Sequence, residues 1–80
     1  MTYVVVQLEQ KGYACPSQWD GMTREGDSFY ARYRSGRFYA TVCKHKIYET
    51  YNAEELGYAS GDVMTTENMK KILKGRVNFK

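Results

Sequence analysis

The sequence has few of the residues that cross-link or interrupt a small domain: two cysteines, one proline and one histidine in 80 residues. Two cysteines are too few for the disulfide framework on which secreted domains of this size rely, so we expect an intracellular chain in a reducing compartment. No apolar run approaches the ~20 residues that a membrane-spanning helix needs, and no basic segment or cleavage site follows Met1. We therefore expect a cytoplasmic, unexported protein with no membrane partner.

Signatures of catalysis and of cofactor binding are also missing. The G-x-G-x-x-G and G-x-x-x-x-G-K patterns do not occur, and the seven glycines fall at predicted turns. His45 lies between Lys44 and Lys46, which leaves it facing water, and no nucleophile has a base beside it. The acidic pair Glu54-Glu55 opens a predicted helical turn, where carboxylates serve as capping groups. We expect no enzyme, no catalytic residue and no cofactor.

The two thiols allow three interpretations. Cys43 and His45 are spaced to share one face of a strand and Cys15 can join them, but no C-x-x-C or H-x-x-x-H pairing accompanies them. A bridge between Cys15 and Cys43 requires strands that lie side by side, and the sequence does not supply the Cα separation. We favour buried thiols, a surface imidazole and no metal site, and leave the bridge open.

Hydrophobic and aromatic side chains are abundant. They make up 42% and 15% of the residues, with eight tyrosines, three phenylalanines and one tryptophan, which excludes a disordered chain. Eighty residues provide one core and no second one, so residues 1–80 are expected to form a single domain. The net charge of +3 and a pI near 8.9 permit an anionic partner without requiring one.

The most informative stretch is a predicted β-hairpin in which residues 29–34 and 37–43 flank the two-residue loop Ser35-Gly36. This loop places Arg34 opposite Arg37 and fixes the pairing outward to Phe29 opposite Val42. A one-residue slip would bury arginine, so the register is well determined. One face carries residues suited to a core: Phe29, Ala31, Tyr33, Phe38, Ala40 and Val42. The other carries Tyr30, Arg32, Arg34, Arg37, Tyr39 and Thr41.

The residues before the hairpin indicate a strand and an irregular extended segment. Residues 3–9 alternate with period two, and the face expected to turn inward carries Val5, Gln7 and Glu9. Lys11-Gly12 is expected to turn the chain. Pro16 lacks an N–H group and makes residues 13–22 extended but irregular, with Trp19 as a core anchor. A turn follows at residues 24–27, with Gly26 at a positive φ.

The C-terminal half is predicted to be helical. Residues 52–57 carry an N-cap, a glutamate at the third helical position and a terminating glycine, which indicates one or two turns. Residues 65–75 predict a helix with an apolar stripe formed by Met69, Ile72 and Leu73. The tail, residues 76–80, either pairs as a short strand or frays.

Together these elements predict an α+β fold: a small antiparallel sheet of three to four strands with one face packed by the C-terminal helix, in a two-layer sandwich. Such a sandwich covers only one face of its sheet. The other face, which carries the hairpin's arginines and tyrosines, is then left for water or for a partner.

We call that surface the Arg/Tyr face and define it as Tyr30, Arg32, Arg34, Arg37 and Tyr39. Tyrosine and arginine are enriched at protein-binding hot spots, and tyrosine can also stack on single-stranded bases while arginine contacts phosphate. A purely structural alternative has Arg32 stacked on Tyr39, with the other guanidinium groups neutralised by Asp20, Glu25 or Asp27. Arg34 opposite Arg37 fits that alternative least, because like charges directly opposite destabilise a hairpin unless an anion joins them.

One segment carries a resemblance to other proteins. It begins at Cys15-Pro16-Ser17-Gln18-Trp19-Asp20 and continues through Thr23, Gly26, Tyr30 and Arg32-Tyr33-Arg34. These residues resemble small uncharacterised proteins of actinobacteria and their phages that share a W-D, then G, then Y-x-R-Y-R pattern. The resemblance covers about residues 15–36 and implies a bacterial or phage origin, with no activity attached. By analogy, a phage origin implies a small non-catalytic protein that binds and redirects a host factor.

We therefore expect a small non-enzymatic protein-binding module, such as a phage or mobile-element accessory or inhibitory protein, whose Arg/Tyr face contacts an acidic surface of a host protein. Two alternatives stay open. One is single-stranded nucleic-acid binding through tyrosine stacking and arginine–phosphate contacts, against which the modest net charge and the absence of an RNP-like aromatic signature count. The other is homo-oligomerisation, for example as a homodimer, through the same face or an unpaired strand edge.

Overall fold

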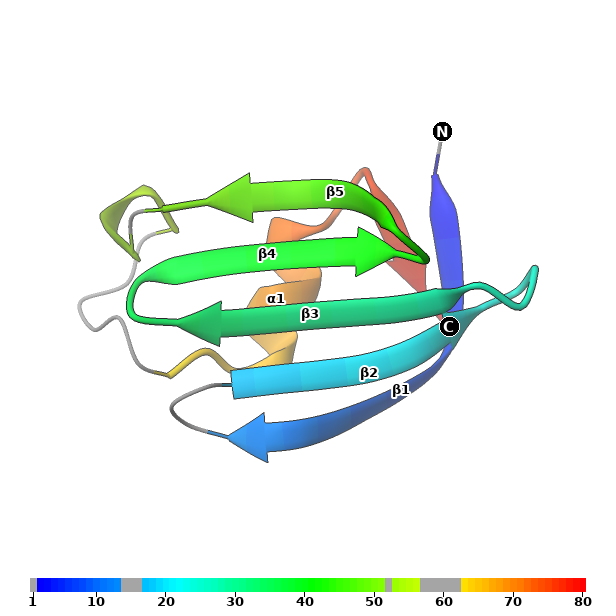
Figure 1. The fold of residues 1–80 in the computed structure, drawn as a ribbon, viewed down its shortest axis with the longest axis horizontal. Coiled ribbons are helices and arrows are strands. Elements are labelled where there is room, and N and C mark those ends of the chain that lie inside the picture. The colour runs from blue at the N-terminus through cyan, green and yellow to red at the C-terminus, as the bar shows by residue number, and fades with distance from the viewer. Residues whose placement is uncertain (1, 14–16, 52, 57–62) are drawn as a thin grey trace.

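The computed structural model describes residues 2–13, 17–51, 53–56 and 63–80 (Figure 1). Its strands are β1 (Tyr3–Tyr13), β2 (Ser17–Thr23), β3 (Ser28–Arg34), β4 (Arg37–Val42), β5 (His45–Thr50) and β6 (Val77–Phe79). The two helices are short: the 3-10 helix η1 (Ala53–Leu56) and the α-helix α1 (Thr66–Ile72). The described chain is therefore mostly β.

The strands form one six-stranded sheet in the order β5-β4-β3-β2-β1-β6. All neighbours are antiparallel except β6, which runs parallel to β1. The sheet is curled like half a barrel, and α1 lies on its hollow side (Figure 1). The prediction of a three- to four-stranded antiparallel sandwich is wrong: the sheet is larger and mixed, and the single α-helix is a minor part of it. A curled sheet encloses most of a core by itself, so one short helix is enough to cover it.

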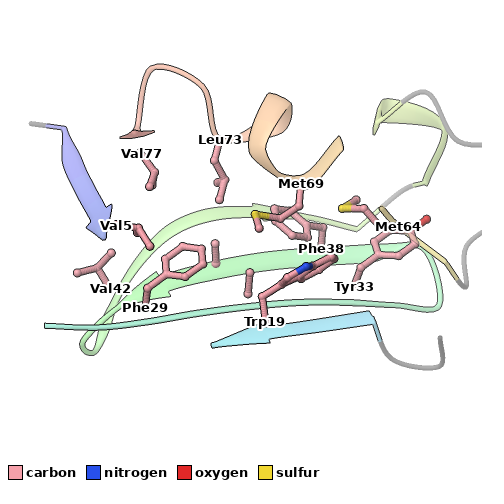
Figure 2. Close-up of a cluster of buried hydrophobic side chains, with 12 residues drawn as sticks. Val5, Trp19, Phe29, Tyr33, Phe38, Val42, Met64, Met69, Leu73 and Val77 are labelled. Carbon is pink, nitrogen blue, oxygen red and sulfur yellow. The ribbon is translucent and has the colours of Figure 1, made fainter. Parts of the chain in front are cut away.

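The core lies between the curled sheet and α1 (Figure 2). The sheet contributes its largest buried side chains, Trp19, Phe29, Tyr33 and Phe38. The C-terminal third of the chain supplies Met64, Met69, Leu73 and Val77 from the other side. Each of these eight side chains is at most 2% exposed, so their burial, at roughly 25 cal/mol per Å² of apolar surface, is the main stabilising contribution.

The β3–β4 hairpin has the predicted register. Arg34 pairs with Arg37, Phe29 pairs with Val42, and the four pairs between them follow in order. Ser35 and Gly36 have φ values of 53° and 76°, the two positive values that a type I′ two-residue turn requires. The burial of alternate residues along β3 and β4 confirms which face turns inward.

The N-terminal strands differ from the prediction in two places. β1 continues through Lys11-Gly12 to Tyr13, so the chain does not turn there, and β2 is a regular strand from Ser17 onward. Within β1, Val5 is buried as expected, but Gln7 and Glu9 are exposed. The register with β2 shifts between Val5 and Gln7, and this bulge turns the following residues to the other face.

The C-terminal half follows the prediction more closely. Thr65 caps α1 by accepting a hydrogen bond from the Asn68 N–H at 3.2 Å, and Met69 and Leu73 are buried. Residues 53–56 form a single 3-10 turn; the expected cap and stop residues on either side lie outside the described residues. The tail pairs as β6, the first of the two outcomes left open. The prediction missed β5 altogether.

Candidate binding site on the outer sheet face

The Arg/Tyr face lies on the outer surface of β3 and β4, because the strand alternation that buries the core residues turns its members outward. Tyr30, Arg32 and Tyr39 are half-buried there, while Arg34 and Arg37 are exposed at the end of the hairpin. The structure thus brings all five predicted residues together on one surface.

A groove of about 340 Å³ opens on this face beside the hairpin turn. Residues of β3, the hairpin turn, β4 and β5 line it: Arg32, Arg34, Ser35, Arg37, Phe38, Tyr39, Glu49 and Thr50. Glu49 is the contribution that the sequence analysis missed, since β5 was not recognised. Tyr39 pairs with Glu49 across β4 and β5, so extending the hairpin register by one strand is the signal that finds it.

Arg34 and Arg37 are direct cross-strand partners at the hairpin end. The ion pairs within the described part of the chain are Lys11–Glu9 and Lys46–Glu49, so neither arginine belongs to one. The Arg37 guanidinium instead lies 4.6 Å from the centre of the Tyr51 ring, which is 63% exposed. This cation–π contact orients Arg37 without neutralising its charge.

The tyrosines of the face pair with each other. The rings of Tyr30 and Tyr39 lie 5.8 Å apart, centre to centre, at a tilted angle of 58°. Burial raises the pKa of the Tyr30 phenol above its ordinary value of 10.0, and the adjacent Tyr39 raises it further. The cation–π contacts among the described residues are made by Arg37, Lys70 and Arg76, so stacking of Arg32 on Tyr39 is not among them.

Arg32 is the innermost cation of the groove. Its Nε atom is buried and has no hydrogen-bond partner among the described residues. Asp20, one of the carboxylates expected to neutralise the arginines, lies opposite Tyr30 and belongs to no ion pair in the described chain. A buried guanidinium N–H without an acceptor costs free energy, and Arg32 forms no ion pair with a described carboxylate that could offset this cost.

Among the described residues that line the groove, Glu49 is the one that carries a carboxylate. Its Oε2 atom lies 2.8 Å from Lys46 Nζ, and hydrogen bonds from Lys46 and Tyr51 hold the pKa of Glu49 below its ordinary value of 4.5. Glu49 is therefore ionised at neutral pH. Three guanidinium groups and one carboxylate leave the groove lining with a net charge of +2.

Cys43 and His45 lie away from this groove. Cys43 is a free, exposed cysteine in the β4–β5 turn with φ of 58°, so the prediction of a buried thiol is wrong for it. The strand ends one residue earlier than expected, which places Cys43 in the turn instead of the sheet. Cys15 lies outside the described residues, and His45 is exposed. Across the described ranges, no group of three histidine, cysteine or acidic side chains is placed to hold a metal ion.

No helix within the described ranges has the length and apolarity needed to cross a membrane. No protein-family model, curated protein or solved structure matches this chain. Its function therefore has to be inferred from the groove and the Arg/Tyr face themselves.

Proposed function

We propose that this chain is a small non-enzymatic protein-binding module whose Arg/Tyr face binds an acidic surface of another protein. The observation that carries the proposal is the cross-strand pair Arg34–Arg37, joined in one groove by Arg32. Like charges directly opposite each other destabilise a β-hairpin. An incoming carboxylate removes that repulsion and gains charge-assisted hydrogen bonds to the guanidinium groups.

The tyrosines add the apolar part of such a contact. Tyr30 and Tyr39 present two neighbouring rings beside the groove, and the exposed ring of Tyr51 lies against Arg37. Rigid aromatic side chains next to arginine are the commonest anchors of protein interfaces, because they bury a large area with little loss of conformational entropy. The face therefore combines the two residue types that contribute most binding energy per side chain.

The charges around the face favour a protein partner over a nucleic acid. Glu49 lies in the groove itself, and Glu9 pairs with Asp20 on the same outer surface across β1 and β2. These carboxylates interrupt the positive surface that a phosphate backbone follows, and the whole chain carries only +3. A discrete acidic anchor suits a short cationic groove better than a continuous polyanion does.

The resemblance of residues 15–36 to small actinobacterial and phage proteins suggests the biological context in which the module acts. We infer that the module is an accessory or inhibitory protein of a phage or mobile element, acts in the cytoplasm, and uses the Arg/Tyr face to engage a host protein. Homodimerisation through the same face is the competing use, and the experiment below separates the two.

The test is quantitative partner capture with three tagged proteins in a bacterial host lysate. They are the wild type, the triple variant R32E/R34E/R37E and the control K71E/K74E/K80E, which changes the net charge equally at exposed lysines away from the face. We expect one acidic protein to be captured by the wild type and the control and to be lost with the triple variant. Equal capture by all three proteins, or capture of a second copy of the chain alone, contradicts the proposal.

A further inference from the structure

The groove has a charge that a single carboxylate does not balance. Its lining includes Arg32, Arg34 and Arg37 against Glu49, a net +2, and the two charged groups bonded to the lining, Lys46 on Glu49 and Glu55 on Thr50, cancel each other. A glutamate or aspartate side chain brings one negative charge, as do a sulfate ester and a phosphodiester. A phosphomonoester brings about −1.5 to −2 at neutral pH, together with three strong acceptor oxygens.

The arrangement of the arginines also suits an anion with several oxygens. Arg34 and Arg37 approach the groove from opposite strands of the hairpin, and Tyr51 holds the Arg37 guanidinium at 4.6 Å from its ring. Two guanidinium groups on neighbouring strands that contact the same anion each need an acceptor atom of their own. A tetrahedral phosphoryl group supplies them, whereas the two oxygens of a carboxylate lie in one plane.

The remaining walls fit the side chain that carries such a group. Tyr39 lines the groove together with the arginines, while the ring of Phe38 is buried in the core beneath it, and the volume of about 340 Å³ lies near the lower limit for sites that hold a small organic group. The groove thus accommodates one terminal phosphoryl group and the first atoms of its carrier.

From this geometry we propose that the groove of Arg32, Arg34, Arg37 and Glu49 binds a phosphomonoester, so that the anchor of the partner protein is a phosphorylated side chain. The inference rests on the proposed function and deepens it by naming the chemical group that the Arg/Tyr face reads. Recognition of phosphorylated side chains by clustered arginines is a recurrent mode of protein binding.

The first experiment measures binding of three small probes by NMR titration of the full chain. Phenyl phosphate and phenyl sulfate have the same shape and differ in charge near about pH 7.5, and benzoate supplies a carboxylate. We expect phenyl phosphate to bind at least about fivefold more tightly than the other two, with shifts in residues 34–39 and 49–51. That preference is expected to vanish near about pH 5, where the phosphate dianion has taken up one proton and carries a single negative charge, as the sulfate does.

Phenyl sulfate controls for titration of the protein itself, since it does not change charge in that range. His45, the one imidazole of the chain, does not line the groove, and Glu49 stays ionised because its pKa is lowered. The variant R34Q/R37Q is expected to lose phenyl phosphate binding while K71Q/K74Q keeps it. E49Q removes one negative charge from the groove lining. It is therefore expected to tighten phenyl sulfate binding and to reduce the ratio of phenyl phosphate affinity to phenyl sulfate affinity.

Equal affinity for phosphate and sulfate, no binding of either probe, or equal binding of a phosphodiester oligonucleotide overturns the inference. The second experiment repeats partner capture after the lysate has been treated with a broad-specificity phosphatase. We expect capture to be lost, and unchanged capture overturns the inference too. If capture still depends on Arg32, Arg34 and Arg37 after phosphatase treatment, the proposed function stands and only the phosphorylated anchor is rejected.

Discussion

Trp19 donates its indole N–H to the hydroxyl of Thr66 at 2.7 Å, and this bond ties the middle of the sheet to the first turn of α1. The same hydroxyl donates to Gln10 Oε1 at 2.8 Å, so it links three elements. Trp19 is fully buried, and an indole N–H left without an acceptor there costs about 1–3 kcal/mol. We therefore predict that Thr66→Val lowers the unfolding free energy by about 1–3 kcal/mol, as measured by urea denaturation. Thr66→Ser keeps the hydroxyl and is expected to lose much less; equal stability of wild type and Thr66→Val contradicts the assignment.

Gly21 is required by the bulge in β1. A Cβ atom at position 21 meets the backbone oxygen of Gln7 at 2.3 Å and Val5 Cγ1 at 3.3 Å. Backbone cannot move aside as a flexible side chain can, so we predict that Gly21→Ala lowers the unfolding free energy by about 1–3 kcal/mol. The neighbouring Met22→Ala, at a 42% exposed position, is expected to change it by less than about 0.5 kcal/mol. Similar losses of unfolding free energy in the two variants argue against the close contact between position 21 and the Gln7 backbone oxygen.

Ser35 occupies a position that favours a different residue. Its φ of 53° precedes that of Gly36 in a two-residue type I′ turn, for which Asn-Gly is preferred. We predict that Ser35→Asn raises the unfolding free energy by about 0.5 kcal/mol. Ser35→Val is expected to lower it, because a branched Cβ is strained at positive φ. Changes of the same sign in the two variants, measured by thermal and urea unfolding, contradict a type I′ turn.

Glu49 gives the fold a specific acid dependence. Its pKa is lowered in the folded state by hydrogen bonds from Lys46 and Tyr51, so its stabilising contribution is present above the ordinary value of 4.5 and is lost as the pH falls through the folded value. We predict that the urea midpoint of Glu49→Gln falls less than that of the wild type between about pH 6 and pH 3. Urea midpoints that fall by the same amount with pH in the two proteins contradict a stabilising Lys46–Glu49 pair. Glu9→Gln, which removes the more exposed Lys11–Glu9 pair, serves as the comparison.

The hairpin that carries the Arg/Tyr face could be predicted from sequence because every signal in it agrees. The Ser35-Gly36 turn fixes the register, and both strands alternate without interruption, so the turn and the two hydrophobic patterns point to the same pairing. The helix at residues 66–72 could also be predicted from sequence, because an N-cap at Thr65 precedes an apolar stripe. Local chemistry determines both elements.

The errors arise where local chemistry and the sheet disagree. β5 contains a register shift beside Thr41, and with His45 and Lys46 at its start its residues do not alternate between apolar and polar. The bulge in β1 reverses the faces of Gln7 and Glu9, and no residue type near Val6 marks it. The parallel pairing of β6 depends on where α1 returns the chain. Glu49, which lines the groove, and Tyr51, which stacks on Arg37, were missed for the first of these reasons.

The most direct test of whether the Arg/Tyr face contacts a partner protein is photo-cross-linking inside the cells in which the protein naturally occurs. Benzoylphenylalanine replaces Tyr39 beside the groove in one protein and Lys71, on the exposed side of α1, in another. We predict that position 39 forms a covalent adduct with a second protein, that the adduct disappears when Arg34 and Arg37 are also changed to glutamate, and that position 71 forms none. Adducts from position 71 alone, or an adduct of position 39 with nucleic acid, contradict the account.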